Sequence, residues 1–440
     1  MDKLSILKGR IVPVLVMIIF STTIYQGCSS NDSPGSESVD TTPPSTPTGL
    51  VATHISATTI TLSWEEATDN VGGIQYDIFL EGTRTTTLTD TVYTLTGLEA
   101  DTKYIIAVRA KDTTGNVSQG SVSIEVKTLQ TNIPVQVSGD ITSYLGNILA
   151  DMPGASENQY NSPTVQQITD WEEIIEALLA RDIPKAIVAA NPLGYQVTIF
   201  IDTAFSPSQK FYILEKKSSG NNHWGTYVFH TTPIKENLIL QAPHALYDTN
   251  TGKEAIYCFK NTGAMALFLN GVHRCNSMVN SSCSGTTSVC GSTQPYRISD
   301  LAHATQAVFQ KTTEILLQWN TNTLFIQLHG FSKRSTDPYV IMSNGTRHTP
   351  AIDYAVKLKE AIQEEDAALT FKLAHIDTEW TRLIGFTNVQ GRLINQSTTP
   401  CEQSTTISSG RFIHVEQEKT RLRADEQGWK KMSNALNKVF

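Results

Sequence analysis

The sequence lacks three features that would assign it quickly to a common class of protein. Basic residues are not in excess: 34 Lys and Arg stand against 42 Asp and Glu, for a formal charge of −8. This balance excludes the positive surface by which proteins hold nucleic acid, so we expect no nucleic-acid partner. The apolar run Ile11–Phe20 is too short to span a bilayer as a helix. The six cysteines contain no CxxC pair, the spacing typical of zinc ribbons.

The N-terminal residues 1–27 are typical of a secretion signal. Three basic residues precede the apolar run Ile11–Phe20, and small and polar residues follow it. The segment ends in a glycine and Cys28, which resembles the processing site of bacterial lipoproteins, where the cysteine is acylated and becomes the mature N-terminus. We therefore expect a lipid on Cys28 and a membrane-anchored protein that faces the periplasm or the cell surface. Ordinary secretion with a free thiol is the alternative.

Residues 28–43 are rich in Ser, Thr, Pro and Asp. This composition favours a flexible chain over a packed core, so we expect a tether between the membrane and the first domain. At 440 residues the chain is long enough for two or three domains.

Five cysteines remain for an oxidising compartment if Cys28 carries lipid. They are Cys258, Cys275, Cys283, Cys290 and Cys401. The stretch from 275 to 290 has no strong core signal, so we predict a disulfide there, either within the stretch or out to Cys258 or Cys401. One cysteine must be left over. The wide gaps within the stretch disfavour a metal site.

Residues 44–128 carry short alternating polar and apolar stretches separated by turns, from "TITLSWEEA" to "SVSIEVKT". Seven or so strands of this kind predict an antiparallel sandwich. Trp64 matches the buried tryptophan of fibronectin type III domains, and Leu98 with Tyr104 matches their tyrosine corner. The segment resembles that family throughout, which implies a spacer or an adhesive module.

Between residues 135 and 440, helical and strand patterns alternate. The stretch "TVQQITDWEEIIEALLARDI" repeats apolar residues at helical spacing, whereas "NLILQAPH", "MALFLNGVHR", "LFIQLHGF" and "RFIHVEQE" are apolar strands. The alternation predicts an α/β fold with a mostly parallel or mixed sheet covered by helices on both faces. In open sheets of this kind ligands bind at the carboxyl ends of the strands.

Polar side chains end several of these strands. His244 ends "LILQAPH", and His329 ends "LFIQLHGF". Arg274 ends "ALFLNGVHR", and Glu416 lies in "FIHVEQE". Two histidines and an acid would give zinc three protein ligands and leave one position for water, with Glu416 nearby as a base. An arginine beside such a site suits a substrate carboxylate, which it can bind in a fork.

Each residue also has a simpler explanation. A histidine at a strand end is often only hydrogen-bonded. Arg274 could pair with a surface carboxylate, and Glu416 could belong to a solvated face. His273 and His303 compete for the ligand roles, while Asp300 suits either a functional acid or the N-cap of a helix.

A family resemblance enters with these motifs. The order "APH…D", "GAMALFLNGVHR", "FIQLHG" and "FIHVEQEKTRLR", over residues 235–435, is similar to that of the N-formylglutamate amidohydrolases. It is more distantly similar to the zinc carboxypeptidases and aspartoacylases, which implies a zinc carboxypeptidase-like fold. The resemblance implies that His244 and His329 bind zinc. It also implies that Glu416 is the general base and that Arg274 contacts the substrate or an oxyanion.

One ligand departs from the family pattern. In carboxypeptidase-type sites the acid lies three residues after the first histidine, and Tyr247 occupies that position here. We expect Asp248 to be the third ligand, because "HALYDTNT" can turn back to present it. Glu254 is the reserve.

Together these patterns predict an extracytoplasmic lipoprotein whose domain 135–440 hydrolyses an amide bond with zinc. The substrate would be a peptide, a cell-wall peptide or an N-acyl amino acid. The alternative is a non-catalytic surface protein that serves in adhesion or binds a polymer. A glycosidase is disfavoured, because no pair of strand-end carboxylates stands out. Metal content separates the first two hypotheses, because a binding protein has no need of zinc.

Overall fold

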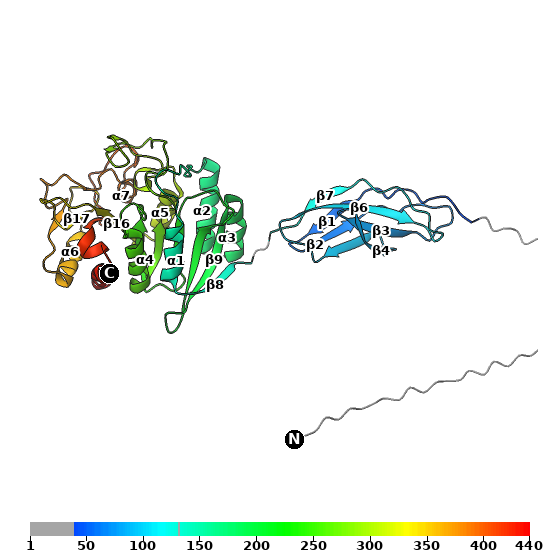
Figure 1. Ribbon diagram of the computed structural model, residues 1–440, viewed down its shortest axis with the longest axis horizontal. Coiled ribbons are helices and arrows are strands. Elements are labelled where there is room, and N and C mark those ends of the chain that lie inside the picture. The colour runs from blue at the N-terminus through cyan, green and yellow to red at the C-terminus, as the bar shows by residue number, and fades with distance from the viewer. Residues whose placement is uncertain (1–38, 131–132) are drawn as a thin grey trace, which may run out of the picture. The chain divides into compact units, whose positions relative to one another are not determined.

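The structure is a computed structural model that describes residues 39–130 and 133–440. Two compact units make up the chain, with their boundary between Leu129 and Gln130 (Figure 1). The predicted signal peptide, Cys28 and most of the predicted tether lie outside the described residues. Within the described residues, no helix is both long and apolar enough to cross a bilayer.

The first unit is a sandwich of two antiparallel sheets. One sheet has the order β1-β2-β5, with β1 (Val51–Ile55), β2 (Thr59–Ser63) and β5 (Val92–Thr96). The other has the order β4-β3-β6-β7, with β3 (Gln75–Leu80), β4 (Thr83–Leu88), β6 (Lys103–Lys111) and β7 (Ile124–Lys127). Alternate side chains of these strands enter the core between the sheets, as expected for a sandwich with two solvated outer faces.

The core of this unit contains the residues that carried the resemblance to fibronectin type III domains. Trp64 is buried and packs edge-on against Tyr76, with ring centroids 5.4 Å apart. The hydroxyl of Tyr104 accepts a hydrogen bond of 2.8 Å from the backbone N–H of Glu99. This bond back to the residues just before the strand is the tyrosine corner expected from the sequence.

The second unit is built on one sheet of ten strands in the order β18-β17-β19-β16-β12-β13-β11-β10-β9-β8. The strands are β8 (Val135–Gly139), β9 (Tyr195–Asp202), β10 (Gln209–Lys216), β11 (Thr226–His230), β12 (Lys235–Ala242), β13 (Ala264–Leu269), β16 (Leu324–Phe331), β17 (Val340–Ser343), β18 (Phe371–Leu373) and β19 (Phe412–Glu418). The central four, β13, β12, β16 and β19, are parallel. Antiparallel pairs flank them, so the sheet is mixed.

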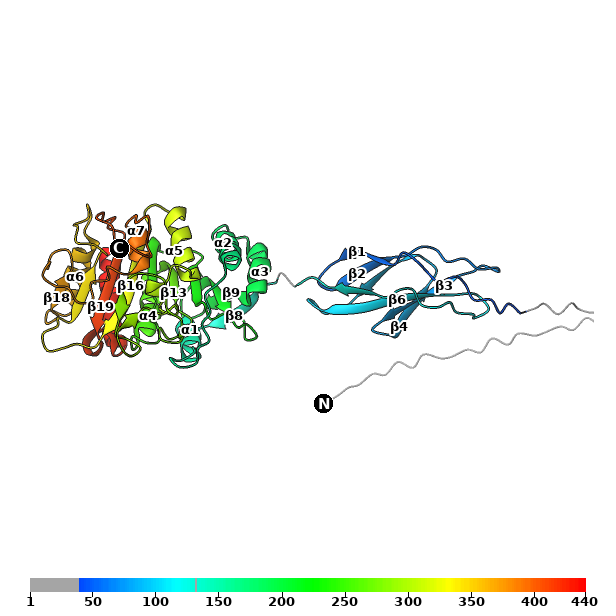
Figure 2. The same ribbon diagram turned by 90° about the horizontal axis from the view of Figure 1, so that it is seen from above.

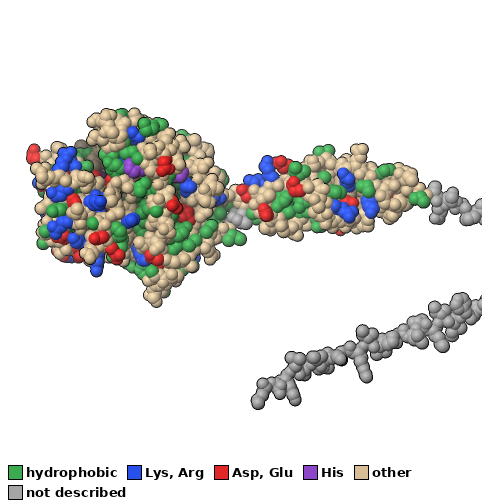
Figure 3. All heavy atoms as spheres, in the orientation of Figure 1, with side chains coloured by type: hydrophobic (Ala, Val, Ile, Leu, Met, Phe, Trp, Pro, Cys, Tyr) green, Lys and Arg blue, Asp and Glu red, His purple; other side chains and the backbone are tan. Residues whose placement is uncertain are grey.

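Helices cover both faces of the sheet (Figure 2). One apolar layer includes α1 (Ile141–Ala150), α4 (Thr251–Thr262), α6 (Tyr354–Glu365) and α8 (Glu426–Val439). The other includes α2 (Val165–Leu179), α3 (Ile183–Ala190), α5 (Val308–Trp319) and α7 (Val389–Ile394). Burial on both faces explains why the central strands are continuous apolar runs. On the side seen in Figure 3, Lys and Arg side chains are interspersed with Asp and Glu.

The structure differs from the expected element boundaries in two places that affect the site. Strand β13 ends at Leu269, so Arg274 lies in the following loop and does not end the strand. Helix α5 begins at Val308, and residues 301–303 form a separate 3₁₀ turn. Asp300 occupies the N-cap position of that turn, but its side chain makes no capping hydrogen bond there.

Two disulfides stabilise the loops that follow the central strands. Cys275 pairs with Cys290, and Cys283 pairs with Cys401. One pair therefore lies within the predicted stretch and the other reaches out of it, which confirms the disulfide prediction. Cys258 on α4 is the free cysteine of the described residues and is fully buried.

Candidate metal centre

The candidate site lies where the parallel strands β12, β16 and β19 end. His244 is two residues beyond the end of β12, and His329 lies near the end of β16. Strand β16 lies between β12 and β19, and Glu416 of β19 is the register partner of His329. The sheet topology therefore brings His244, His329 and Glu416 to one edge, and the turn after His244 adds Asp248.

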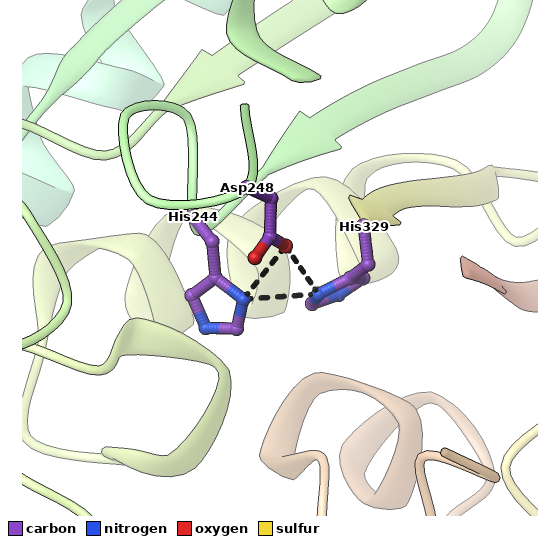
Figure 4. Close-up of side chains that lie close together, drawn as sticks. All are labelled: His244, Asp248 and His329. Atoms are coloured by element: carbon purple, nitrogen blue, oxygen red, sulfur yellow. Dashed lines mark hydrogen bonds and ion pairs between the residues drawn. The ribbon is translucent and has the colours of Figure 1, made fainter. Parts of the chain in front are cut away.

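His244, Asp248 and His329 point toward one another (Figure 4). The two Nδ1 atoms of the histidines are 3.1 Å apart. The Oδ2 atom of Asp248 lies 3.3 Å from the Nδ1 of His244 and 3.7 Å from the Nδ1 of His329. All three side chains are 3% exposed, so these atoms face one another with little access to water.

The outer nitrogen of each histidine has a hydrogen-bond acceptor of its own. The Nε2 of His244 lies 2.8 Å from the Oδ1 of Asp300. The Nε2 of His329 lies 2.8 Å from the amide oxygen of Gln327. An Nε2 that donates to an oxygen leaves the Nδ1 of a neutral imidazole with a lone pair. Both Nδ1 atoms therefore face the centre as acceptors.

The amide of Gln327 is itself fixed by a buried chain of amides. Its nitrogen donates to the side-chain oxygens of Gln241, at 3.0 Å, and Gln390, at 3.2 Å. Its oxygen also accepts a hydrogen bond from the side chain of Asn388. This pattern assigns the oxygen of Gln327 to the side of His329, so the neutral tautomer of His329 is fixed without a carboxylate.

The arrangement fits a bound cation. A backbone donor, the N–H of Gly330, reaches Asp248 at 3.0 Å, and the Nη1 of Arg274 lies 3.3 Å from the Nδ1 of His244. The neighbours of the Nδ1 of His329 are the Nδ1 of His244 and the carboxylate of Asp248. Burial and Arg274 lower the pKa of His244, but Asp300 and Asp248 outweigh them and raise it, so a proton on the Nδ1 of His244 is the alternative to a cation. Zinc bound at about 2.0–2.1 Å from its ligands would hold the ligand atoms roughly 3.3 Å apart, close to the spacing here. Two imidazoles and a carboxylate are also a ligand set that zinc prefers.

A second group of buried side chains adjoins the first and includes a residue that sequence reasoning missed. His414 and Glu416 lie on the same side of β19. The ring of His414 packs on the ring of His329, with ring centroids 4.2 Å apart. The Nδ1 of His414 and the Oε2 of Glu416 are buried without hydrogen-bond partners. His329 belongs to both groups. His414 lies two residues before Glu416, and side chains two residues apart in a strand lie on the same face. The sequence could therefore have indicated His414 as a residue of the site.

Burial and charge change the acidity of these groups. Burial, followed by the negative charge of Asp248, raises the pKa of Glu416 to about 8. Burial lowers the pKa of His329 to about 4, which favours the neutral ring that a metal requires. Burial alone would raise the pKa of Asp248, but the neighbouring histidines hold it well below its ordinary value.

Arg274 is already engaged by Asp300. Its Nε lies 3.0 Å from the Oδ2 of Asp300, and its Nη2 makes a second short contact with the same oxygen. The other oxygen of Asp300 is the acceptor for His244. Asp300 thus orients a candidate ligand and an arginine at once. The Nη1 of Arg274, beside His244, is the part of the guanidinium nearest the candidate ligands.

The remaining candidates have other partners. His273 accepts a hydrogen bond from the N–H of Cys275 and packs on Tyr247. His303 lines the cavity above the site and stacks on Tyr296, with ring centroids 3.5 Å apart.

Two other buried acids near the site, Glu254 and Glu418, also lie outside the group. Glu254 is buried on α4 and accepts a hydrogen bond from Gln417, so Asp248 is the acid that joins the two histidines. Glu418 accepts hydrogen bonds from the N–H groups of Thr420 and Arg421 and therefore caps the next turn.

A cavity of about 580 Å³ opens onto the site. Its lining includes the site histidines, Glu416, the stretch 286–289 of the disulfide-linked loop and the stretch 381–388. Two further arginines reach it. Arg382 is paired with Asp337 at 2.7 Å, whereas Arg334 is exposed. The cavity is therefore polar, with positive charge beside the candidate metal ligands.

Comparison with known proteins identifies the first unit. Residues 45–127 match the fibronectin type III domain family, so this part of the chain is a fibronectin type III domain. Exoglucanase A of Cellulomonas fimi is 47% identical over 93 residues, which cover 20% of this chain and 11% of the exoglucanase. Chitinase A1 of Niallia circulans is 47% identical over 89 residues, covering 20% and 13%.

Two solved structures are similar to about a fifth of the chain. A fibronectin type III domain of a human protein is 27% identical, covers 22% of this chain and 96% of that structure, and has a TM-score of 0.20. A chitinase from Bacillus thuringiensis is 33% identical, covers 20% and 14%, and has a TM-score of 0.20. The chain spans less than a fifth of the length of the curated relatives named above. These similarities concern the fibronectin type III domain and carry no information about the metal centre.

Proposed function

We propose that residues 135–440 form a zinc-dependent amidohydrolase or peptidase domain with a zinc carboxypeptidase-like fold, carried by an extracytoplasmic lipoprotein. The observation that supports this most strongly is the buried group of His244, Asp248 and His329, whose Nδ1 and Oδ2 atoms lie within 3.7 Å of one another. Such an arrangement is costly unless a cation joins the three groups. His244, Asp248 and His329 would hold the zinc ion.

The surrounding residues would take the other roles in amide hydrolysis. A bound zinc ion supplies Lewis acidity and lowers the pKa of water. Glu416 takes the proton from the attacking water and passes it to the leaving amine, a role that suits a carboxylate with a pKa near neutrality. Asp300 keeps His244 in the tautomer that binds metal, and Arg274 provides positive charge for an oxyanion or a substrate carboxylate.

The cavity favours a polar substrate with an anionic group. Its size, about 580 Å³, accommodates a dipeptide or an N-acyl amino acid, and Arg274 and Arg334 line it. A peptide, a cell-wall peptide or an N-acyl amino acid meets these requirements. The two disulfides suit a protein that folds outside the cytoplasm.

The competing function is a non-catalytic surface protein. Fibronectin type III domains similar to the one here occur in proteins named as chitinases and exoglucanases, so attachment to a polymer is a second possible role. In this case the second domain would bind its ligand without hydrolysing it.

The test is metal content combined with turnover. The purified protein is analysed for metals and then assayed against N-acyl amino acids, short peptides and chitin oligosaccharides. We expect near-stoichiometric zinc and hydrolysis of an amide in one of the first two groups. The proposed hydrolase would be contradicted if the protein neither contains nor takes up zinc and leaves every compound of the panel intact.

A further inference from the structure

A buried arginine lies beneath the candidate metal centre. Arg423 is 2% exposed and ends the π-helical turn Lys419–Arg423 that directly follows β19. Its hydrogen bonds end on four uncharged oxygens: the carbonyls of Gln417 at 3.0 Å, Phe331 at 3.4 Å and Thr249, and the hydroxyl of Thr251. A buried cation that makes no ion pair with a carboxylate is unusual, because burial penalises the charge. The buried acids Glu254 and Glu416 lie within electrostatic range of Arg423 but do not bond to it.

The three carbonyls belong to the segments that carry the site. One is in the residue directly after Asp248, one is in the residue directly after Glu416, and one is two residues after His329. These segments come from a loop and from two strands that are far apart in sequence. A single guanidinium therefore joins the backbones that deliver two candidate ligands and the candidate base.

Gly330 provides the space for this arrangement. A Cβ atom on Gly330 would lie 2.0 Å from the Cζ of Arg423 and 2.3 Å from its Nη1. The N–H of the same glycine donates to Asp248 at 3.0 Å. The backbone beside His329 thus contacts the arginine on one side and a candidate ligand on the other, and any side chain at this position would push the guanidinium away.

We infer that Arg423 is a positioning residue of the metal centre: its guanidinium sets the spacing of the segments that carry His329, Asp248 and Glu416. The inference rests on the proposed zinc site. Arginine suits the task because its planar fork presents five donors in fixed directions and can bond three segments at once. A lysine keeps the charge but offers one small ammonium group, so it cannot reach all three carbonyls in the same geometry.

The test compares zinc affinity with folding in the full chain. In Arg423→Lys we expect the zinc dissociation constant, measured by competition with a chromophoric chelator, to rise by about tenfold or more. We also expect the visible spectrum of the cobalt-substituted protein to change, because that spectrum reports the arrangement of the ligands. Circular dichroism and thermal unfolding show whether the variant is folded.

Arg347→Lys is the matched control. Arg347 also bonds backbone carbonyls without a carboxylate, those of Ala374, Asp377 and Trp380, and none of these adjoins a candidate metal ligand or the candidate base. We expect this variant to lose stability but to keep the zinc affinity and the cobalt spectrum of the wild type. Equal losses of zinc affinity in both variants would overturn the positioning role and leave a general effect on stability.

Gly330→Ala provides an independent test that retains the arginine. The added methyl group should displace the guanidinium and weaken zinc about as much as Arg423→Lys does. In an Arg423→Ala background the same substitution meets open space, so its additional effect should be small, a coupling that a double-mutant cycle measures. If Arg423→Lys does not fold, Gly330→Ala in the two backgrounds provides the test.

The outcomes separate the two proposals. If the wild type takes up no zinc, both the proposed function and the positioning role fail. If the wild type binds zinc and folded Arg423→Lys and Gly330→Ala bind it equally tightly, only the positioning role fails.

Discussion

Glu416 and His329 are register partners on the parallel strands β19 and β16. Facing residues of neighbouring strands project from the same side of a sheet, so backbone pairing alone places the carboxylate beside the imidazole. Neither side chain depends on a mobile loop for its position. A site built on paired strands is better preorganised than one built on loops, which suits a base that must lie close to a metal ligand.

Removal of the histidines tests the metal centre most directly. We expect His244→Ala and His329→Ala to lose bound zinc, because each removes one of the inward-facing lone pairs. Asp248→Asn should weaken binding, because it removes the negative charge. His273→Ala is the control, since His273 lies outside the group. Elemental analysis after dialysis measures the result, and a His329→Ala protein that binds zinc like the wild type would show that the site is placed wrongly.

Replacement of Glu416 separates binding from chemistry. Glu416→Gln keeps the size of the side chain but removes the base, so we expect zinc and folding to be retained and hydrolysis to fall by about 10²-fold or more. Glu418→Gln serves as the comparison, because Glu418 caps the turn after β19. It should change stability more than turnover. Unchanged activity in Glu416→Gln would remove this residue from the mechanism.

The amide chain behind His329 gives a prediction about metal affinity. Gln327→Met keeps the volume of the side chain but removes the acceptor of the Nε2 proton, so the ring loses its fixed tautomer. We expect zinc affinity to fall by about 10–100-fold, the range usual for groups that orient a ligand. Gln310→Met is the control, because Gln310 contacts the same chain through Gln390 and not through the histidine. Similar losses in both variants would point to general destabilisation.

The raised pKa of Glu254 leads to a prediction of how the free energy of unfolding depends on pH. Burial, opposed by Arg423 and by the hydrogen bond from Gln417, raises the pKa of Glu254 from 4.5 to about 8. Between these values the folded state holds a proton that the unfolded state has released, so the free energy of unfolding falls as pH rises through this window. In Glu254→Gln we expect this fall to be reduced. Denaturant titrations across the window measure it, with the exposed Glu236→Gln as the reference. An identical pH dependence in wild type and Glu254→Gln would contradict the assignment.

Cys28 tests the membrane anchor. We expect the protein expressed in a bacterial host to fractionate with membranes and to carry the mass of a lipid. Cys28→Ala removes the acylated thiol, so its product should lack the added mass and should not mature in the same way. Mass spectrometry of the two products decides the question, and identical masses and solubility would reject the anchor.

The sequence predicts the parts of this molecule that depend on local patterns. Apolar runs marked the central strands, and the polar residues at their ends marked His244, His329 and Glu416. A strand such as β17, four residues long and buried throughout, carries too little pattern to be recognised. Its antiparallel position beside β19 depends on pairing between distant segments, which a local pattern does not contain.

The supporting residues of the site were harder to predict for a related reason. Gln327 and Arg423 are polar residues of types usually found in solvent. The apolar run around Gln327 indicates a buried strand but not the partners of its amide, and the charged residues around Arg423 indicate exposure. The pairing of Asp300 with Arg274 joins residues 26 positions apart, and the sequence around Asp300 suits a helix N-cap as well as a functional acid. Residues that act through a histidine or a backbone carbonyl become visible only when the fold brings them together.

The free thiol of Cys258 bears on how the chain reaches its native pairing. The side chain is fully buried on α4, and burial, followed by the charge of Glu254, raises its pKa well above the ordinary value for cysteine. A thiol that is neither ionised nor accessible does not attack disulfides. Once α4 has packed, Cys258 can no longer form a non-native disulfide. The order of events then matters. Of the five cysteines in the described residues, a chain oxidised before this helix docks can pair any, and a chain oxidised afterwards can pair only the other four.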